Sequence, residues 1–405
     1  MNPIGTTSAR ALTLGTAGAL VAGLIATTAA PANADNVDVP PTKTVSGELN
    51  GPIGMADDAA GNIYLASQNS NAVVVHRKNA QGASAPIRRI RGASTQLSLP
   101  QDVALDSNGF IYVANSGGAV LVFPPNANGN VAPTKVFGTG PGSALSLDIA
   151  GGEIYVRKPN GYNVYAPSAT GSPATPERAV TGLAFSYPLA VHGSKVWVTS
   201  GTQLRAYSTS ADGADTPIQV VANPGGVNTY GLDTDSAGRV YVPEFSGRLR
   251  VYAPNADGAD GPLKVLGGPA SGLQNVTGVE TLSGGAVAIA GYTNNRYSVF
   301  SDLFRKPATK PGKVRALKVG GKATAKYRKI SWKAPASNGG AKITSYRIVV
   351  RKGGKVLVQR TVGGSKRSIV VKRSQLRKGI DTVQIRAKNS KGHGPVAKRN
   401  FRVRK

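Results

Sequence analysis

The chain of 405 residues has no cysteine and only three histidines. Without cysteine it can form neither a disulfide nor a thiolate metal site, and it has no thiol nucleophile. His76 and His192 fall in different repeats and His393 in another domain, so the three cannot converge on one zinc ion. Phosphate-binding loops, G-x-S-x-G turns and paired-histidine zinc motifs are also missing. These absences leave carboxylates and cations as the candidate functional groups.

Acidic residues are nearly absent from the last quarter of the chain. Residues 305–405 hold 31 Lys and Arg and one acid, Asp381, whereas residues 1–304 hold 18 basic and 19 acidic residues. The first region is therefore near neutral and the second has a net charge of +30. Such self-repulsion destabilises a small domain, so the charge predicts an anionic polymer as partner.

No apolar run after residue 34 is long enough to span a bilayer. Residues 1–34 have one charge, Arg10, before a weakly apolar run that ends at Pro31-Ala32-Asn33-Ala34. Small residues at 32 and 34 are typical of a signal-peptide cleavage site. The alternative is a membrane anchor, since roughly 20 residues can cross a bilayer, but the many Gly and Thr make this run a poor one. We expect cleavage before Asp35 and a secreted, cell-envelope-associated protein without a membrane span.

Glycine (51) and proline (26) are abundant and lie between short apolar strands, which indicates an all-β protein. An anchor on the second strand after a "D-x-x-G" turn recurs at spacings of 48, 43, 42, 44 and 47 residues. Four-stranded propeller blades repeat at roughly this length. The anchors are Tyr64, Tyr112, Tyr155, Trp197, Tyr241 and Ala288.

One phrase recurs in these units, as in "VFPPNANGNVAPTKVFG" (122–138) and "VYAPNADGADGPLKVLG" (251–267). In the unit 100–138 the predicted strands are 100–106, 110–115, 119–123 and 133–138, so the phrase joins the third strand to the fourth. Asn and Gly suit a tight reversal that needs positive φ or side chain–backbone hydrogen bonds. The phrase is predicted to be structural.

The strand count indicates how the array closes. Six sets of first-to-third strands are present, but only five fourth strands. The segment "PTKTVSG" (41–47) matches "PTKVFG" (133–138). We expect it to complete the blade of residues 276–301 as a latch, because open blades would expose unpaired edges.

The segments "LPQDVALDSNGFIYVANS" (99–116) and "TYGLDTDSAGRVYVPEFS" (229–246) resemble NHL repeats. The resemblance covers residues 41–301 and implies a six-bladed β-propeller. The family's Asp after the second strand is replaced by Asn115, by Glu244 and, in the third unit, by Arg157-Lys158. These departures weaken any transfer of a family function.

The segments "KISWKAP" (329–335), "ITSYRIVV" (343–350) and "VQIRAKNSKGHGP" (383–395) resemble a fibronectin type III domain. The resemblance rests on Trp332, Tyr346 and the A-x-N-x-x-G ending and implies a β-sandwich. The family's corner tyrosine is replaced by Asp381-Thr382. The predicted organisation is a signal peptide (1–34), a propeller (35–304), a linker (305–312) and the basic sandwich (313–405).

Strand alternation predicts where the sandwich charge lies. Side chains alternate along a strand, so if Tyr346 and Ile385 point inward, their neighbours in sequence point outward. These strands share one sheet in fibronectin type III domains. One anion-binding face is therefore predicted, with a generally basic, highly soluble domain as the alternative. Its residues are Arg347, Arg351, Arg386, Lys388, Arg402 and Arg404.

The propeller offers a few candidate ligand residues. Propeller relatives with lactonase activity hold calcium at the channel mouth, and Asp102, Asn115 and Glu244 could copy that arrangement, although strand-end acids usually serve as scaffold. Arg157, Lys158 and Tyr162 could instead bind an acidic group. We expect no cofactor and no metal, with calcium as the alternative, and no catalytic residue is assigned.

The function predicted is non-enzymatic. The propeller would bind a ligand that the sequence does not identify, and the sandwich would attach to an anionic cell-wall polymer or acidic glycan. The alternatives are a metal-dependent propeller enzyme, lactonase-like or carbohydrate-active, and an extracellular nucleic-acid-binding protein.

Overall fold

The computed structural model describes residues 34–222, 229–304 and 308–404. The chain divides into two compact units, Met1–Leu303 and Phe304–Lys405. The predicted signal peptide lies, except for its last residue, outside the described residues. Within the described ranges, no helix is long and apolar enough to cross a membrane.

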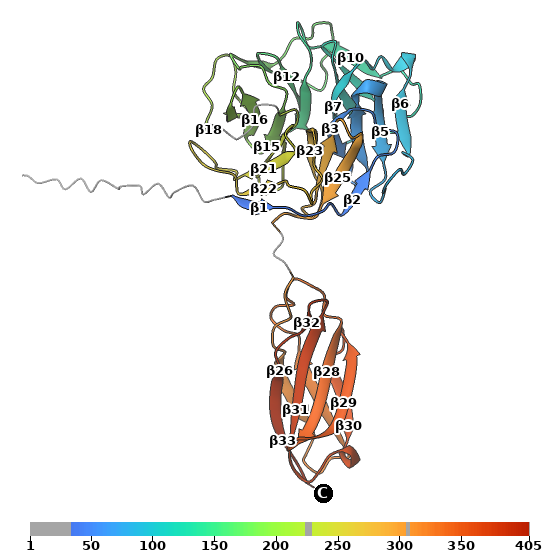
Figure 1. Ribbon diagram of the computed structural model, residues 1–405, viewed down its shortest axis with the longest axis vertical. Coiled ribbons are helices and arrows are strands. Elements are labelled where there is room, and N and C mark those ends of the chain that lie inside the picture. Colours follow the sequence, from blue (N-terminus) through green and yellow to red (C-terminus); the bar gives the residue numbers. More distant parts are fainter. Residues whose placement is uncertain (1–33, 223–228, 305–307, 405) are drawn as a thin grey trace, which may run out of the picture. The chain divides into compact units, whose positions relative to one another are not determined.

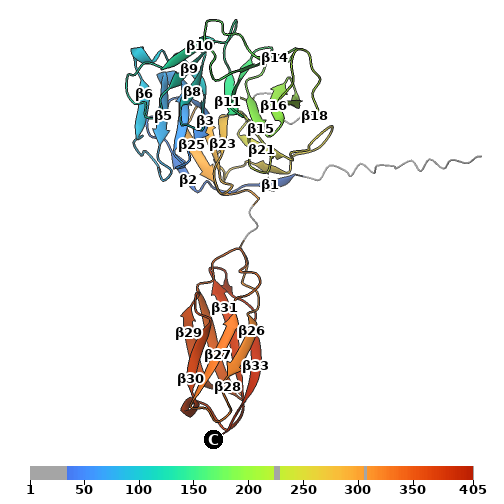
Figure 2. The same ribbon diagram turned by 180° about the vertical axis from the view of Figure 1, so that it is seen from behind.

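The first unit consists of sheets built from four antiparallel strands, one of which gains a fifth, parallel strand (Figures 1 and 2). Short 3₁₀ turns, η1 (Gln68–Ser70) and η2 (Ala93–Thr95), interrupt the loops. The first three sheets contain β3 (Pro52–Asp57), β4 (Ile63–Ser67), β5 (Ala72–His76) and β6 (Arg88–Arg91); β7 (Pro100–Leu105), β8 (Ile111–Asn115), β9 (Ala119–Phe123) and β10 (Lys135–Gly138); and β11 (Ser146–Ala150), β12 (Glu153–Lys158), β13 (Gly161–Tyr165) and β14 (Arg178–Thr181).

Three further sheets follow the same plan, and the last two each include a strand from the N-terminal end of the unit. They contain β15 (Leu189–His192), β16 (Lys195–Ser200), β17 (Gln203–Ser208) and β18 (Gln219–Ala222); β19 (Asp233–Thr234), β20 (Val240–Glu244), β21 (Arg248–Tyr252) and β22 (Lys264–Leu266) with β1 (Asp35–Val37); and β23 (Val276–Thr281), β24 (Val287–Gly291) and β25 (Arg296–Phe300) with β2 (Lys43–Val45).

The first strands of these sheets form a closed series around the centre of the unit. Strand β3 contacts β7, β7 contacts β11, β11 contacts β15, β15 contacts β19, β19 contacts β23, and β23 contacts β3. Outer strands such as β6 and β18 lie at the rim (Figure 2). Sheets arranged radially around a central channel define a β-propeller.

The core of the propeller lies between neighbouring sheets. Tyr64 packs in one buried cluster with Val113 and Phe123 of the next sheet. Trp197, 1% exposed, packs in the same way with Val240 and Tyr252. Each sheet buries side chains on both faces, which explains why its strands read as nearly continuous apolar runs.

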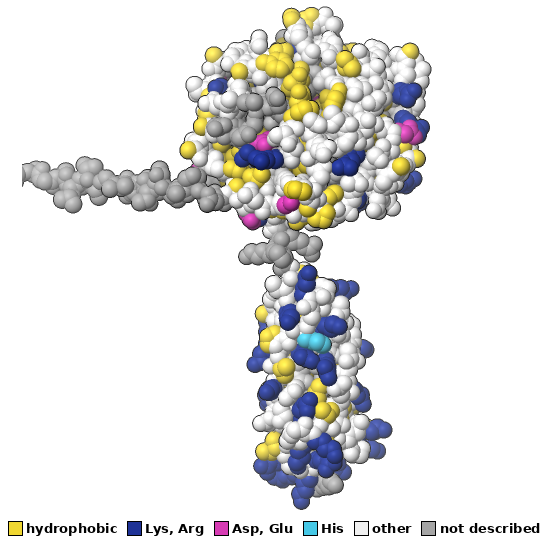
Figure 3. Space-filling view, in the orientation of Figure 1, with side chains coloured by type: hydrophobic (Ala, Val, Ile, Leu, Met, Phe, Trp, Pro, Cys, Tyr) yellow, Lys and Arg dark blue, Asp and Glu magenta, His cyan; other side chains and the backbone are white. Residues whose placement is uncertain are grey.

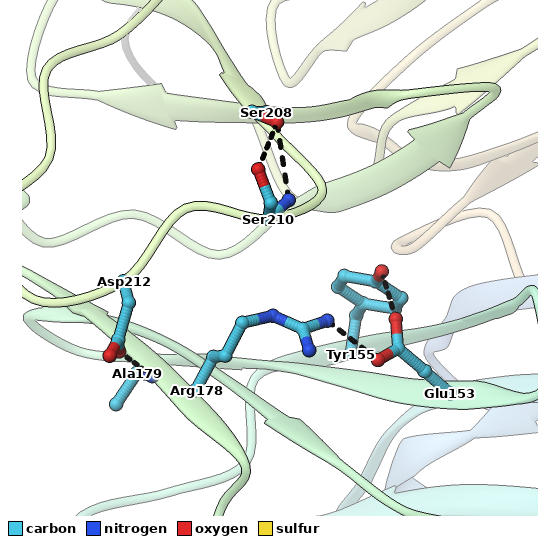
Figure 4. A network of polar contacts seen from close by, with 7 residues as sticks. All are labelled: Glu153, Tyr155, Arg178, Ala179, Ser208, Ser210 and Asp212. Atoms are coloured by element: carbon cyan, nitrogen blue, oxygen red, sulfur yellow. Dashed lines mark hydrogen bonds and ion pairs between the residues drawn. The ribbon is translucent and has the colours of Figure 1, made fainter.

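The repeated phrase joins each sheet to the one before it. The amide of Gly213 donates to the carbonyl oxygen of Ala179 at 2.9 Å, and the carbonyl of Gly213 accepts from the amide of Thr181 at 2.8 Å. The Asp212 carboxylate accepts from the Ala179 amide at 2.8 Å (Figure 4). The same pair of backbone bonds recurs at Gly82, Gly129 and Gly258. The phrase is therefore a clamp between sheets, as its predicted structural role requires.

The predicted latch is present. Strand β2 pairs antiparallel with β25, with Thr44 opposite Ser298. Val45 of this strand is fully buried in the cluster that joins the last sheet to the first. The N-terminal segment therefore completes the sheet of residues 276–300, as the strand count predicted.

A second N-terminal contact was not predicted. Strand β1 runs parallel to β22, with Asn36 opposite Val265, and the amide of Gly267 donates to the carbonyl of Val37 at 3.0 Å. In the other sheets the repeated phrase occupies this place beside the preceding outer strand. The last sheet has no covalent third-to-fourth connection, so residues before β2 take over the position of the phrase.

The second unit has two sheets with one shared core. Trp332 and Tyr346 lie in this core with their ring centres 5.3 Å apart. The helical turn η3 (Arg373–Gln375) follows β30. One sheet is β26 (Arg315–Gly320), β27 (Tyr327–Lys333) and β30 (Ser368–Lys372); the other is β28 (Ser345–Lys352), β29 (Lys355–Gly363), β31 (Gly379–Asn389), β32 (Gly392–His393) and β33 (Ala397–Val403), with β31 central and paired to β28, β32 and β33.

Candidate functional site

The register of the second unit brings predicted cations together. Arg347 on β28 lies directly opposite Arg386 on β31, and Lys388 lies opposite Ser345. Directly opposed residues of an antiparallel pair have side chains on the same face of the sheet. Arg351 and Arg402 lie opposite Thr382 and Ile380, which share that face by alternation along β31.

Five of the six predicted cations therefore lie on the outer face of one sheet. Arg404 follows the end of β33 and is exposed. Lys398 was missed: it lies opposite Gln384, and therefore on the same face, and it is exposed. Alternation along the last strand, applied back to its start, would have found it. We call the following six residues the basic face: Arg347, Arg351, Arg386, Lys388, Lys398 and Arg402.

The basic face contains a shallow groove of about 160 Å³ whose lining includes Arg347, Arg351 and Arg386. These three arginines are half-buried, while Lys388, Lys398 and Arg402 are exposed. Lys and Arg side chains are scattered over the whole visible surface of the second unit and are sparse on the propeller (Figure 3). The face presents several cations around a depression.

No carboxylate neutralises these cations within residues 308–404. The ion pairs formed by the described residues lie in the first unit. The single acid, Asp381, is fully buried, and burial raises the pKa of its carboxyl group. Its Oδ2 accepts from the Arg377 amide at 3.3 Å, so it bonds back to the preceding corner. Asp381 thus bonds to the backbone and, in the described part of the chain, forms no ion pair with the basic face, where Arg347 and Arg351 donate to the neutral oxygens of Gln359 and Gly354.

His393 lies in the positive electrostatic potential of the basic face. Burial lowers the pKa of this imidazole, and the positive charges of Arg386, Lys388 and Arg347 lower it further. A positive potential disfavours the imidazolium form. The same potential would attract an anion.

The structure brings Arg157, Lys158 and Tyr162 together but buries them. The Arg157 guanidinium donates to the carbonyls of Lys158 and Gly161, and to that of Ala184 at 3.0 Å. Lys158 Nζ donates to Thr139 Oγ1 at 2.8 Å, and burial lowers its pKa to about 8. The Tyr162 hydroxyl is buried, with no hydrogen-bond partner among the described residues. The two cations hold backbone carbonyls of neighbouring loops.

Asn115 and Glu244 also serve the scaffold. Asn115 accepts from the Ser98 amide at 2.9 Å and donates to the Gln96 carbonyl at 3.0 Å. Glu244, 3% exposed, pairs with Arg250. Neither side chain meets Asp102 to form a metal site: the described residues contain no group of three or more His, Asp or Glu side chains that could hold a metal ion.

Asp102 lies in the central channel with acids from four other sheets. The channel cavity measures about 160 Å³ and is lined by the first strands of the sheets. Asp102 Oδ2 accepts from the Leu147 amide at 3.1 Å, Asp148 Oδ2 from the Val191 amide at 2.7 Å, and Asp233 Oδ2 from the Thr281 amide at 2.5 Å. Each carboxylate therefore bridges to the first strand of the neighbouring sheet. The acids of the channel are Asp57, Asp102, Asp148, Asp233 and Glu280.

Burial sets the protonation of these acids. It raises the pKa of Asp102 and of Asp233 to about 7, and backbone hydrogen bonds oppose the rise. Burial also raises the pKa of Glu280, and the negative charges of Asp233 and Asp57 raise it further. The charged form loses its hydration in the channel, so these groups bind protons at far higher pH than in water.

A second cavity of the propeller escaped the sequence reasoning. It measures about 400 Å³ and is lined by residues at the start of first strands and just after second strands. We call it the mouth cavity. Its aromatic residues lie outside the blade motif, and only their shared position relative to the strands could have pointed to them. They are Phe185, Tyr187, Tyr230, Phe245 and Tyr292.

Comparisons with known proteins extend only to the fold. No family model matches the chain, and no curated protein matches its sequence. Among solved structures, the WD40 β-propeller domain of Doa1 is similar, with 12% identity, a TM-score of 0.48, and coverage of 65% of this chain and 97% of that domain. At this score the likeness adds no argument, so the propeller assignment rests on the arrangement of the sheets.

Proposed function

We propose that this chain is a secreted, non-enzymatic binding protein that the basic face attaches to an anionic polymer of the cell envelope. In this proposal the first unit is a six-bladed propeller of the NHL type and the second is a fibronectin type III domain. The blade number is supported by the closed series of first strands. The sandwich type is supported by the three-stranded sheet packed on the β29–β28–β31–β33 sheet around Trp332 and Tyr346.

The observation that carries the proposal is a basic face that has no carboxylate partner within residues 308–404. Six cations share one sheet surface, three of them line a groove, and the only acid of residues 308–404 is buried beneath. Holding like charges together costs free energy, and a bound polyanion offsets this repulsion. The cations also release the counterions condensed on the polyanion, which further favours binding. Arginine adds paired hydrogen bonds to carboxylate, phosphate or sulfate groups.

An acidic glycan or wall polymer suits the face better than single-stranded nucleic acid. Proteins that bind single strands stack the bases on aromatic side chains between the cations. On the outer side of the β28, β31 and β33 sheet, the strand residues between the cations are aliphatic or uncharged polar, for example Val349, Thr382 and Gln384. None of these strand residues is aromatic. This surface can therefore recognise the charged groups along a polymer but cannot stack bases.

We propose binding and not metal-dependent catalysis for the propeller. The channel carboxylates accept backbone amides of neighbouring sheets, and Arg157 and Lys158 hold loop carbonyls. These hydrogen bonds give the carboxylates and the two cations a role in joining the sheets, and this scaffold role accounts for their presence without a catalytic ion.

The test is retention of the full chain on immobilised wall teichoic acid and on heparin. A variant with all six basic-face residues changed to Ser should elute at much lower salt than the unchanged chain. The matched control changes six exposed lysines away from the face and should elute close to the unchanged chain. Its residues are Lys318, Lys322, Lys329, Lys333, Lys366 and Lys372. Equal losses in the two variants would show that only net charge matters, and the proposed face would be wrong.

A further inference from the structure

We propose that the mouth cavity of the propeller binds a neutral sugar ring of a glycan. This site is independent of the basic face. Its volume of about 400 Å³ falls within the range typical of small-molecule sites, roughly 300–1,000 Å³. The cavity lies at the end of the channel where first strands begin, for example at Ile53 and Gln101.

One side of the cavity is an aromatic platform. The ring centres of Tyr187 and Tyr230 are 4.5 Å apart, Phe185 lies 5.3 Å from Tyr187, and Phe245 lies 5.6 Å from Tyr230. The four rings thus form a continuous row carried by two neighbouring sheets. Phe185 is 57% exposed, an unusual position for so large an apolar side chain.

The remaining wall is uncharged and mixes polar side chains with the apolar Ile53, Leu145 and Pro159. Gln68, Gln101, Ser116 and Ser143 line it, and the Tyr292 hydroxyl donates to Gln68 Oε1 at 2.9 Å. No Lys, Arg, Asp or Glu is among the described residues that line the cavity. A charged ligand would therefore be desolvated without a compensating partner, which selects a neutral one.

A pyranose ring fits this division of the wall. Its axial C–H groups make one apolar face that can cover the aromatic platform, and its rim of hydroxyls can bond the amides and hydroxyls opposite. Tyr187 and Tyr230 also line the cavity, and their hydroxyls are polar groups that a ligand hydroxyl could bond. A quaternary ammonium group would instead favour rings on several sides, and a purely apolar ligand would strip water from the two glutamines without replacing it.

The test measures binding of neutral tetrasaccharides to the full chain by calorimetry and by ligand-observed NMR. The probes are maltotetraose, cellotetraose, mannotetraose and chitotetraose; they carry no charge, so failure here leaves the polyanion proposal standing. At least one should bind, and Tyr230→Ala and Phe185→Ala should each weaken it by ~10-fold, as expected for loss of a stacking ring. Tyr230→Phe should retain most of the affinity through the ring.

The control is Tyr327→Ala, which removes an aromatic that is 48% exposed on the second unit, and it should leave sugar affinity unchanged. Three results would overturn the proposal. They are no binding of any of the four probes, equal weakening by Tyr327→Ala, and tighter binding of tetramethylammonium than of every sugar.

Discussion

The glycine of the repeated phrase is required by its backbone conformation. Gly258 has φ +57° and Gly213 φ +59°, values that L-residues with a side chain adopt at a cost. A Cβ at either position would meet no atom within 4 Å, so space is not the reason for glycine. The left-handed turn aims the backbone of the phrase at the preceding outer strand.

Gly258→Ala should therefore destabilise the propeller by ~1 kcal/mol, measured by chemical unfolding. The matched control is Gly117→Ala, because a Cβ there also meets nothing within 4 Å but φ is not positive. This control should be neutral or slightly stabilising. A neutral Gly258→Ala would show that the turn tolerates side chains and that the phrase is conserved within the chain for another reason.

The channel carboxyls give the propeller a pH dependence with a definite sign. Their pKa values are higher in the folded than in the unfolded chain, to about 7 for Asp102 and Asp233, so the folded state binds more protons between pH ~4 and ~7. The free energy of unfolding should therefore fall as pH rises through this window, by up to roughly 1.4 kcal/mol per pH unit for each group.

Asp102→Asn should flatten this slope, because an amide does not titrate. Chemical unfolding of the two proteins at pH 5, 6, 7 and 8 measures the difference. His76, whose pKa is lowered by burial, titrates in the opposite sense but equally in both proteins. Identical slopes would mean that Asp102 titrates normally in the folded protein.

Residue roles were the hardest feature to predict from the sequence. The pattern found the cations of β28 and β31 because alternation with Tyr346 and Ile385 determines their side of the sheet. It did not reveal that Arg157 and Lys158 turn inward, since the carbonyls they hold come from loops that are distant in sequence, at Ala184 and Gly142. The aromatic platform was not predicted for the same reason, because its rings come from neighbouring sheets that are distant in sequence.

At the scale of elements, the two N-terminal strands tie different sheets. Strand β1 has Asp35 paired with Lys264 at its exposed start, whereas β2 buries Val45 completely. The sequence predicted β2 because "PTKTVSG" matches the fourth strands of other units. It could not predict β1, whose parallel pairing with β22 depends on backbone bonds and has no residue signature.

Stepwise N-terminal deletion should separate the two strands. Starting from a chain that begins at residue 34, removal through residue 38 should lower the unfolding temperature of the propeller slightly. Removal through residue 47 should destabilise it by more than ~3 kcal/mol, since Val45 and the β2–β25 hydrogen bonds are lost. Calorimetry follows both units, and the second serves as internal control because its core is its own. An unchanged propeller transition after the longer deletion would contradict the latch.

At the scale of the whole molecule, the chain separates a near-neutral propeller from a strongly basic sandwich. The propeller balances its charges with its own ion pairs, such as Arg178 with Glu153 at 2.7 Å (Figure 4). Within residues 308–404 the second unit has a single acid, Asp381, which is buried, so its surface cations have no carboxylate partner there. Composition predicted this division directly, because charge can be counted along the sequence without knowing the fold.

The central claim is that one face of the sandwich, and not net charge alone, engages a polyanion. Equilibrium titration of the full chain with heparin between 0.05 and 0.5 M salt tests it most directly, because the slope of log K against log salt counts the cations that displace counterions, at ~0.7–0.9 per contact on nucleic acids. Changing the six basic-face residues to Ser should make the slope shallower by several units, whereas the six-lysine control should stay within about one unit of the unchanged chain. Equal slopes for the two variants would contradict the account.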